Sequence, residues 1–259
     1  KTIMEDRAFG DSGSRVVIEE FLTGPEVSVL AFTDGTAIAP MVSSMDHKRA
    51  GDGDTGPNTG GMGTVAPNPC YTEEVAQVCM DTIFLPTLAA MRAEGCPFKG
   101  CLYFGLMLTP DGPRVIEYNC RFGDPETQVV LPLLKTDLLT VMQAVENETL
   151  GQLTVEWRHA SAACVILTSG GYPGHYEKGK AISLPASLPG NVTIYHAGDR
   201  LDESGRLVTS GGRVLGITAT GPTLRQALAD AYAAAKTVDF GGKYLRHDIG
   251  RRALAALAD

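Results

Sequence analysis

Two pairs of β-rich runs joined by very short turns constrain the fold of this chain most. EVSVLAFT at 26–33 and TAIAPMV at 36–42 flank Asp34-Gly35, a dipeptide typical of tight hairpins. GCLYFGLMLT at 100–109 and RVIEY at 114–118 flank a second turn signal, PDGP. Because a parallel pair needs a long crossover, turns this short predict antiparallel sheet. RVVIEE, just before the first pair, is expected to add a third strand to an antiparallel meander.

One segment with a helical pattern lies between the two hairpins, and three more follow the second hairpin. The segments with helical patterns are 73–94, 126–134, 136–148 and 224–238. A kink is expected at Pro86, and Thr223 and Gln226 have the spacing of a capping box. Residues 43–71 are rich in Gly, Asp and Pro, which predicts a long loop that is either functional or disordered.

The overall fold class that we expect is α/β (α+β), in two domains. Near residues 156–160 the pattern changes to short strands divided by Gly/Pro turns, which predicts one domain over 1–158 and a small mixed α/β domain over 159–259. The first domain is expected to hold the antiparallel sheet with flanking helices.

Composition excludes several classes of partner. The formal net charge of -8 argues against general affinity for nucleic acid. No apolar run approaches the roughly 18 residues of a membrane helix. The six cysteines include no CxxC pair, so neither a zinc site nor a disulfide scaffold is expected, and a cytoplasmic location is favoured.

The strongest candidate for a metal site is the strand VIEYN, which leads into CRFGDPE. Successive side chains of a strand point to opposite faces, so Glu117, Asn119 and Arg121 are expected to share one face. A carboxylate and an amide oxygen are sufficient protein ligands for a Mg²⁺ ion that also binds nucleotide phosphates. Arg121 would then stabilise a transferring phosphoryl group. The alternative is an exposed strand edge with an Arg–Glu ion pair.

A glycine-rich segment, SMDHKRAGDGDTGPNTGGMG at 44–63, is the second candidate site. Its glycines allow the backbone to approach a ligand and direct N–H groups at an anion. Asp46, Lys48 and their neighbours supply charges of both signs, which suits a substrate with an amine and a phosphate. The alternative is an ordinary flexible surface loop.

Two further segments contain candidate binding residues. IEEFLTGPE at 18–26 is suited to a hinge strand that presents backbone groups to an adenine edge and carboxylates to ribose hydroxyls, or else is a solvated strand end. KYLRHDIGRRAL places Arg246 and Arg251 where they would bind a ribose phosphate, or else form a basic helix terminus.

The order of these motifs is more informative than any one of them. VVIEEFLTGPEVSV, DHKRAGDGDTGPNTGGMG, GCLYFGLML, VIEYNCRFGDPETQ, SGGYPGHYEKG, HAG and SGGRVLGITA together resemble the phosphoribosylamine-glycine ligase (glycinamide ribonucleotide synthetase) family of the ATP-grasp superfamily. The resemblance runs over nearly the whole chain. It implies that residues 1–158 form part of an ATP-grasp domain and that 159–259 form the C-terminal domain of this family.

The resemblance also implies an activity. Members of this family use ATP, with Mg²⁺ or Mn²⁺, to ligate glycine to 5-phospho-D-ribosylamine in de novo purine biosynthesis. The products are glycinamide ribonucleotide, ADP and phosphate, and the reaction passes through a glycyl phosphate. The expected partners are therefore these small molecules, with no nucleic acid and no membrane, and the expected state is a monomer or weak homo-oligomer.

Residue roles follow from the match to the family motifs. Glu117 and Asn119 match the metal ligands, and Arg121 matches the catalytic arginine at the phosphoryl group. The nucleotide-binding residues implied are Glu19, Glu20, Phe21, Leu22 and Glu26. The substrate-binding residues implied are Asp46, Lys48, Asn58, Thr59, Gly60, Gly61, Asp124 and Glu126, with Arg246 and Arg251 for the ribose phosphate.

The chain departs from the family pattern in two places. Residues 101–109 contain no Asp or Glu, although many ATP-grasp enzymes have a second metal-binding acid on this strand. Nothing here corresponds to the family's N-terminal nucleotide-fold domain or to its lysine-bearing loop over the ATP phosphates. We therefore expect this stretch alone to be inactive. The alternatives are a catalytically silent nucleotide- or metabolite-binding module, or an ATP-grasp ligase for another carboxylate and amine.

Overall fold

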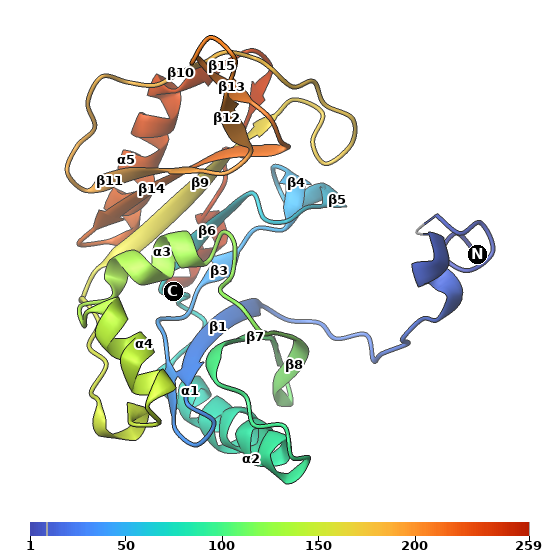
Figure 1. Ribbon diagram of the computed structural model, residues 1–259, viewed down its shortest axis with the longest axis vertical. Coiled ribbons are helices and arrows are strands. Elements are labelled where there is room, and N and C mark those ends of the chain that lie inside the picture. Colours follow the sequence, from blue (N-terminus) through green and yellow to red (C-terminus); the bar gives the residue numbers. More distant parts are fainter. Residues whose placement is uncertain (9, 259) are drawn as a thin grey trace.

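The computed structural model describes residues 1–8 and 10–258, which form two larger β-sheets with helices against their faces, three two-stranded sheets and an N-terminal arm (Figure 1). The strands are β1 Glu26–Thr33, β2 Ile38–Pro40, β3 Met45–Asp46, β4 Arg49–Gly51, β5 Thr55–Asn58, β6 Gly63–Ala66, β7 Gly100–Thr109, β8 Gly112–Asn119, β9 Ser161–Ser169, β10 Ile182–Ser183, β11 Val192–His196, β12 Asp199–Leu201, β13 Leu207–Thr209, β14 Arg213–Gly221, β15 Asp239–Phe240 and β16 Lys243–Tyr244. The α-helices are α1 Glu73–Cys79, α2 Leu85–Ala93, α3 Thr127–Val130, α4 Leu138–Glu146, α5 Leu224–Thr237 and α6 Arg251–Ala256.

The first sheet has the strand order β2-β1-β7-β8, and all its neighbouring strands are antiparallel. Both predicted hairpins are therefore confirmed. Side chains alternate between its faces: Val29 and Phe104 pack against α1 and α2, whereas Leu30 and Tyr103 pack against α3 and α4. Strand β8 is an edge strand, so its polar residues remain accessible beside a covered sheet.

The second sheet has the order β11-β14-β9-β6-β3, with β16 paired to β9 and α5 against one face. Two of its strands, β3 and β6, come from residues 43–71, which therefore do not form one long loop. Helix α3 packs between the sheets, in a core that includes Val130 from α3 and Ile166 from β9. The sheet thus draws strands from both sides of residue 158, and the domain boundary placed there stays a prediction.

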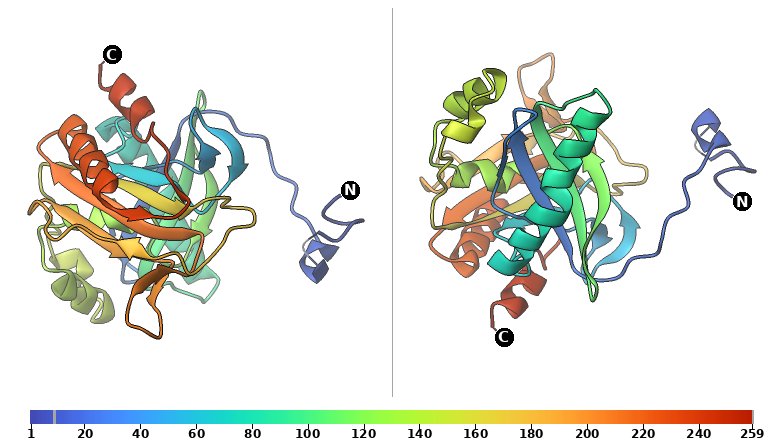
Figure 2. Two further views of the ribbon diagram at one scale, coloured as in Figure 1. Left: turned by 90° about the horizontal axis from the view of Figure 1, so that it is seen from above. Right: turned by 90° about the horizontal axis from the view of Figure 1, so that it is seen from below.

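The segment RVVIEE does not form a strand, so this part of the predicted meander is wrong. Residues 15–25 are extended without regular structure, and the side chains of Val17 and Ile18 are 84% and 91% exposed. The arm that contains them stands away from both sheets in each view (Figure 2). Its β-branched composition favours a strand, but a strand forms only where a neighbour accepts its hydrogen bonds.

The predicted helices are present, with local differences. The helix expected over 73–94 is continuous through α1, a π-helical segment Met80–Phe84 and α2, which begins just before Pro86. A proline cannot donate the usual i→i−4 bond, and the wider π turn comes directly before it. At α5, Thr223 accepts from the Gln226 N–H, but the Gln226 side chain donates to Asp230, so only half of the capping box forms.

Candidate functional site

The candidate metal ligands lie on one face of the first sheet, in two rows that cross three strands. Ser28, Gly105 and Glu117 are direct partners across β1, β7 and β8. Asn119 lies opposite Tyr103 in the next row, so it shares this face with Glu117. A Cβ built on Gly105 would lie 2.9 Å from the Glu117 Cγ, so only glycine leaves room for that side chain beside β7.

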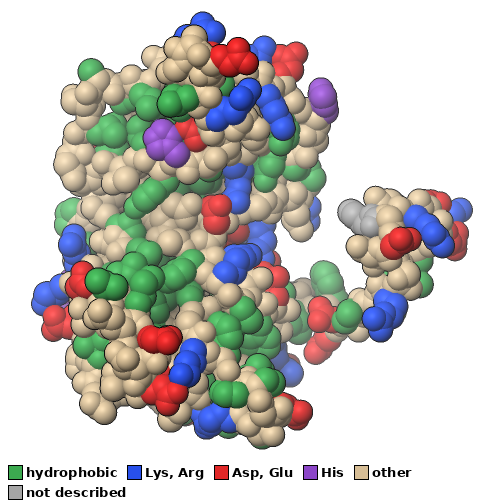
Figure 3. Space-filling view, in the orientation of Figure 1, with side chains coloured by type: hydrophobic (Ala, Val, Ile, Leu, Met, Phe, Trp, Pro, Cys, Tyr) green, Lys and Arg blue, Asp and Glu red, His purple; other side chains and the backbone are tan. Residues whose placement is uncertain are grey.

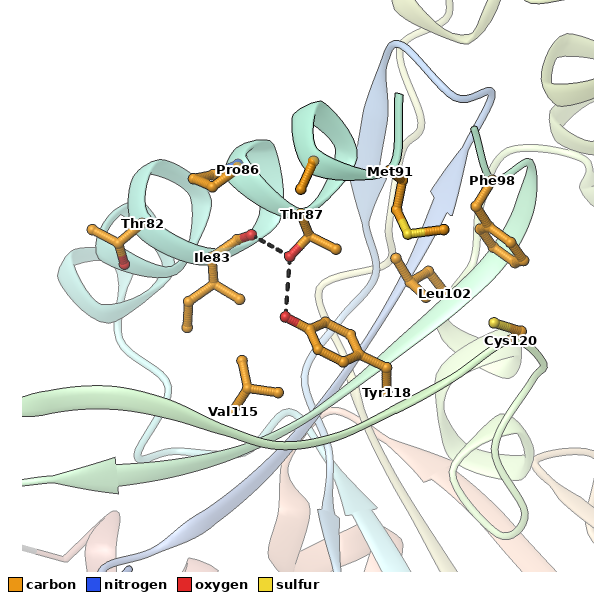
Figure 4. Close-up of a pocket in the computed structure, with 11 residues that line it drawn as sticks. Thr82, Ile83, Pro86, Thr87, Met91, Phe98, Leu102, Val115, Tyr118 and Cys120 are labelled. Atoms are coloured by element: carbon orange, nitrogen blue, oxygen red, sulfur yellow. Dashed lines mark hydrogen bonds between the residues drawn. The ribbon is translucent and has the colours of Figure 1, made fainter. Parts of the chain in front are cut away.

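The opposite face of β8 lies across an apolar pocket of about 480 Å³ from α2 and the π-helical segment that precedes it (Figure 4). Tyr118 points into this pocket, where its hydroxyl lies 3.1 Å from the Thr87 Oγ1. Val115 lines the same pocket, although it is two residues from Glu117. The reason is a β-bulge, because the register with β7 shifts between Gly105 and Leu106.

Lys48, in the glycine-rich segment, contacts the sheet on the face that carries Glu117 and Asn119. Its Nζ lies 2.9 Å from the Glu26 carboxylate on β1. Burial lowers the pKa of Lys48, but the hydrogen bond and charge of Glu26, with the charges of Glu117 and Asp46, outweigh burial and raise the pKa above its usual value. Lys48 is therefore a fixed cation among several carboxylates. Figure 3 shows charged side chains of both signs where the two halves of the molecule meet.

Behind Lys48 lies a buried network of two carboxyl groups. The Glu126 Oε1 accepts from the Tyr103 hydroxyl at 3.1 Å and from the Ser28 hydroxyl at 3.3 Å. The Asp46 Oδ1 accepts from the Thr64 hydroxyl at 3.3 Å. Burial, together with the charge of Glu126, raises the pKa of Asp46 to about 8. Asp46 therefore takes up a proton more readily than an exposed aspartate.

The turn formed by Thr59, Gly60 and Gly61 packs against this network. The Thr59 N–H and hydroxyl both donate to the Lys48 carbonyl, at 2.7 and 2.9 Å. Gly61 has φ +110°, and a Cβ there would lie 2.7 Å from the Asp46 carboxylate and 2.5 Å from the Pro125 ring. Close approach and backbone conformation both require glycine at this position.

Four of the five candidate nucleotide residues lie near the hairpin end of the same strands, whereas Glu26 lies beside Lys48. Glu19, Glu20, Phe21 and Leu22 line a cavity of about 350 Å³ together with four residues of the β7–β8 hairpin. These hairpin residues are Met107, Arg114, Val115 and Ile116. The Phe21 side chain is 90% exposed, so it forms an open wall of this cavity.

The remaining candidates occupy separate positions. Arg121 is exposed two residues beyond the end of β8, and its guanidinium donates to the Phe122 carbonyl. Asn58 is exposed on β5, opposite Arg49. Asp124 is exposed in the turn that precedes Glu126.

Arg246 and Arg251 differ in environment. The Arg246 side chain is 1% exposed, and its guanidinium binds Asp248, Asp54 and the Arg49 carbonyl. These contacts attach the β4–β5 hairpin to the C-terminal segment and favour an anchoring role. Arg251 is exposed and lines a separate cavity of about 480 Å³. The role of both arginines at a ribose phosphate stays a prediction.

Four residues that sequence reasoning did not identify complete the site. Ser28 and Tyr103 bind Glu126, while Arg213 and Tyr172 bind the turn at Gly60. Ser28 and Tyr103 belong to apolar strands, where spacing gives no signal of a polar network. Arg213 was part of a recognised motif, SGGRVLGITA, but no spacing rule links it to residue 60.

His47, next to Asp46, gives a pH-dependent contribution to stability. Its Nδ1 lies 3.0 Å from the Gly63 carbonyl, and its Nε2 accepts from the Gly250 N–H at 3.1 Å. Burial lowers its pKa from 6.5 to about 4. A depressed pKa means that the unfolded chain binds the proton first, so this contribution is complete above pH 6.5 and is lost as the pH falls towards 4.

We therefore expect the urea midpoint of the native protein to fall between pH 7 and pH 4.5 more steeply than that of His47→Gln. Subtracting the variant cancels the titration of the other groups, and the difference should reach a few kcal/mol. Equal slopes in the two proteins would show that His47 is not held neutral.

Among the residues that the structure describes, no three His, Cys, Asp or Glu side chains gather into a metal site. A Mg²⁺ site here thus depends on Glu117 with the amide oxygen of Asn119, a hard oxygen pair that suits this ion. No helix within the same residues is long and apolar enough to cross a membrane.

Comparison with known proteins gives consistent matches along the chain. The family model described as "Phosphoribosylglycinamide synthetase, ATP-grasp (A) domain" matches residues 1–127, and "Phosphoribosylglycinamide synthetase, C domain" matches 162–252. A phosphoribosylamine-glycine ligase of Nostoc sp. PCC 7120 is 49% identical over 94% of this chain and 58% of its own length. The Yersinia pestis ligase is 46% identical over 98% of this chain and 60% of its own length.

The structural match agrees with these relatives. The phosphoribosylamine-glycine ligase of Thermotoga maritima superposes with a TM-score of 0.81 and 38% identity, over 89% of this chain and 56% of that one. The biotin carboxylase domain of a thermophilic 2-oxoglutarate carboxylase superposes with a TM-score of 0.62 and 13% identity, a likeness of fold alone. The chain spans about 60% of the length of the ligases that it matches.

Proposed function

Because the chain belongs to the phosphoribosylglycinamide synthetase family, we propose that it forms part of an ATP-dependent ligase that joins glycine to 5-phospho-D-ribosylamine. The family resemblance of the sequence is confirmed, as is the α/β fold of ATP-grasp type. The proposed products are glycinamide ribonucleotide, ADP and phosphate, in de novo purine biosynthesis. The activity is assigned to the whole protein, of which this chain contributes a part.

The observation that carries the proposal is the convergence of Lys48, Glu26 and Glu117 from three separate segments on one sheet face. A fixed cation can orient an anionic group of a substrate, and fixed carboxylates can orient a cationic group. Glycine has one group of each kind, a carboxylate and an amine, so a site that binds it needs both charges. Catalysis by positioning and electrostatic stabilisation is the mode expected of such a site.

Nucleotide and metal both fit the neighbouring residues. The cavity between Glu19–Leu22 and the β7–β8 hairpin is adjacent to the strand that carries Glu117 and Asn119. The two side-chain oxygens would hold Mg²⁺ or Mn²⁺, which supplies charge neutralisation at the phosphates when bound. Gly105 leaves the space that Glu117 needs for this role.

The chemistry proposed has two steps. A glycine carboxylate oxygen attacks the γ-phosphorus of ATP, ADP leaves, and glycyl phosphate forms. The amine of phosphoribosylamine then attacks the carbonyl carbon, phosphate leaves, and the amine loses a proton. Lys48 and Arg121 would stabilise the negative charge of the phosphoryl oxygens, because Lys48 feels the charge of Glu117 on β8 and Arg121 follows the end of that strand. A cytoplasmic location and a monomeric or weakly oligomeric state stay predictions.

The test is ADP release by the complete enzyme that contains this chain, with Mg²⁺-ATP and with glycine and freshly generated phosphoribosylamine, together and separately. We expect release that requires both substrates. If neither stimulates release while ATP still binds, the glycine assignment fails and the Asp46–Gly63 segment recognises another substrate. The chain alone is expected to be inactive, and substantial turnover by it would contradict this.

A further inference from the structure

Arg213, the first residue of β14, connects two turns of the candidate site that are far apart in sequence. Its Nη1 donates to the Gly60 carbonyl at 2.6 Å and to the Asp124 carbonyl at 2.9 Å. Its Nη2 donates to the Asp124 carboxylate at 3.0 Å. The Arg213 side chain is 21% exposed and that of Asp124 is 52% exposed, so these are charge-assisted bonds at the edge of the solvent.

The turn at Gly60 is held from both sides. While the Gly60 carbonyl accepts from Arg213, the Gly60 N–H donates to the Tyr172 hydroxyl at 3.1 Å. A Cβ built on Gly60 would lie 3.0 Å from the Arg213 Cζ, so the glycine lies closely against the guanidinium. The ring of Tyr172 is itself packed on Gly212, where a Cβ would come within 2.2 Å of it.

Each turn that Arg213 binds leads directly to a buried carboxyl group. Gly61 follows Gly60 and packs against the Asp46 carboxylate. Glu126 follows the Asp124-Pro125 turn and binds Tyr103 on β7. A change in the separation of the turns would therefore move Asp46 relative to Glu126.

From these contacts we propose that Arg213 is a positioning residue for the substrate site. With Tyr172, it fixes the Gly60 turn against the Asp124 turn, so the C-terminal part of the chain sets the geometry of a site built from the earlier part. The kinetic part of this inference rests on the function proposed above. A lysine cannot replace Arg213, because one ammonium group does not reproduce two parallel donors to two turns.

The experiment compares Arg213→Lys with Arg206→Lys in the complete enzyme. Arg206 is a matched control in the same part of the chain, since it also pairs with an aspartate but its side chain is 72% exposed. We expect Arg213→Lys to raise KM for glycine or phosphoribosylamine about 10-fold or more, with KM for ATP within about twofold. Arg206→Lys should leave all three values unchanged.

Hydrogen exchange supplies a second readout that does not depend on activity. In Arg213→Lys, peptides that cover residues 58–63 should exchange faster than in the native enzyme, because the turn loses the bond from the Arg213 guanidinium to the Gly60 carbonyl. Gly60→Ala should also loosen this turn, whereas Gly190→Ala should not, because a Cβ at Gly190 meets no atom within 4 Å.

Unchanged exchange in Arg213→Lys would overturn the proposal, as would a kcat loss with unaltered KM values. The experiments distinguish a failure of the proposed ligase function from a failure of the proposed role of Arg213. If the native enzyme does not require both substrates for ADP release, the ligase assignment falls, and faster exchange in Arg213→Lys still supports positioning of the turn.

Discussion

Replacing Glu117 with glutamine is expected to lower Mg²⁺-dependent ADP release by the complete enzyme at least about 100-fold. Glutamine preserves the volume of the side chain beside Gly105 but removes the negative charge that would bind the metal. Because the remaining ligand proposed is the neutral amide of Asn119, metal affinity should fall with it. Steady-state rates across a Mg²⁺ titration measure both effects.

Tyr118→Phe is the matched control for this prediction. It changes the adjacent residue of the same edge strand, but its hydroxyl contacts Thr87 on the helix side of the sheet. We expect its rate to remain within about threefold of native, since it loses one exposed hydrogen bond. Equal rates for Glu117→Gln and the native enzyme at limiting Mg²⁺ would remove Glu117 from the metal site.

Arg246→Met is expected to reduce the free energy of unfolding by about 3 kcal/mol. The cation is almost fully buried, and its loss leaves Asp248 without its ion-pair partner and Asp54 with only the exposed Arg252. Burial raises the pKa of Asp248, but the hydrogen bond and charge of Arg246 outweigh burial and hold the pKa well below its usual range. The melting temperature should fall by about 5–10 °C.

Two further variants distinguish the loss of the buried ion pairs from a nonspecific loss of stability. Arg252→Met removes an exposed arginine that lies 3.4 Å from the same Asp54, and it should cost less than about 1 kcal/mol. Adding Asp248→Asn to Arg246→Met should recover part of the loss, because it removes the uncompensated charge. If Arg246→Met unfolds like the native protein but raises KM for phosphoribosylamine, the ribose-phosphate role is favoured over anchoring.

Local sequence signals predicted the elements that depend on neighbours in the chain. Asp34-Gly35 and the PDGP turn specify hairpins because their backbone conformations permit only a tight reversal. Thr223 specifies the start of α5 through one hydrogen bond to Gln226, three residues away. The alternation of Glu117 and Asn119 on one face is equally local, so it too was predictable.

Elements that depend on a distant partner were not predictable in the same way. RVVIEE has strand composition but no neighbouring strand, whereas β6, which follows a Gly-rich segment typical of a loop, pairs with β9, about 100 residues later. Pairing is decided by which edge is available to donate and accept hydrogen bonds. The bulge that turns Val115 towards the helices is likewise a property of the pairing with β7.

The sequence by itself determined the hairpins, the helices, the family and the row of oxygen ligands on β8, since each is encoded within a few residues. Tertiary structure alone decided which charges are buried and what they meet. Asp46 and Glu126 share one environment although 80 positions separate them, and Arg213 joins their turns from β14. Burial and long-range contact depend on how the two sheets pack around α3, and no local pattern carries that information.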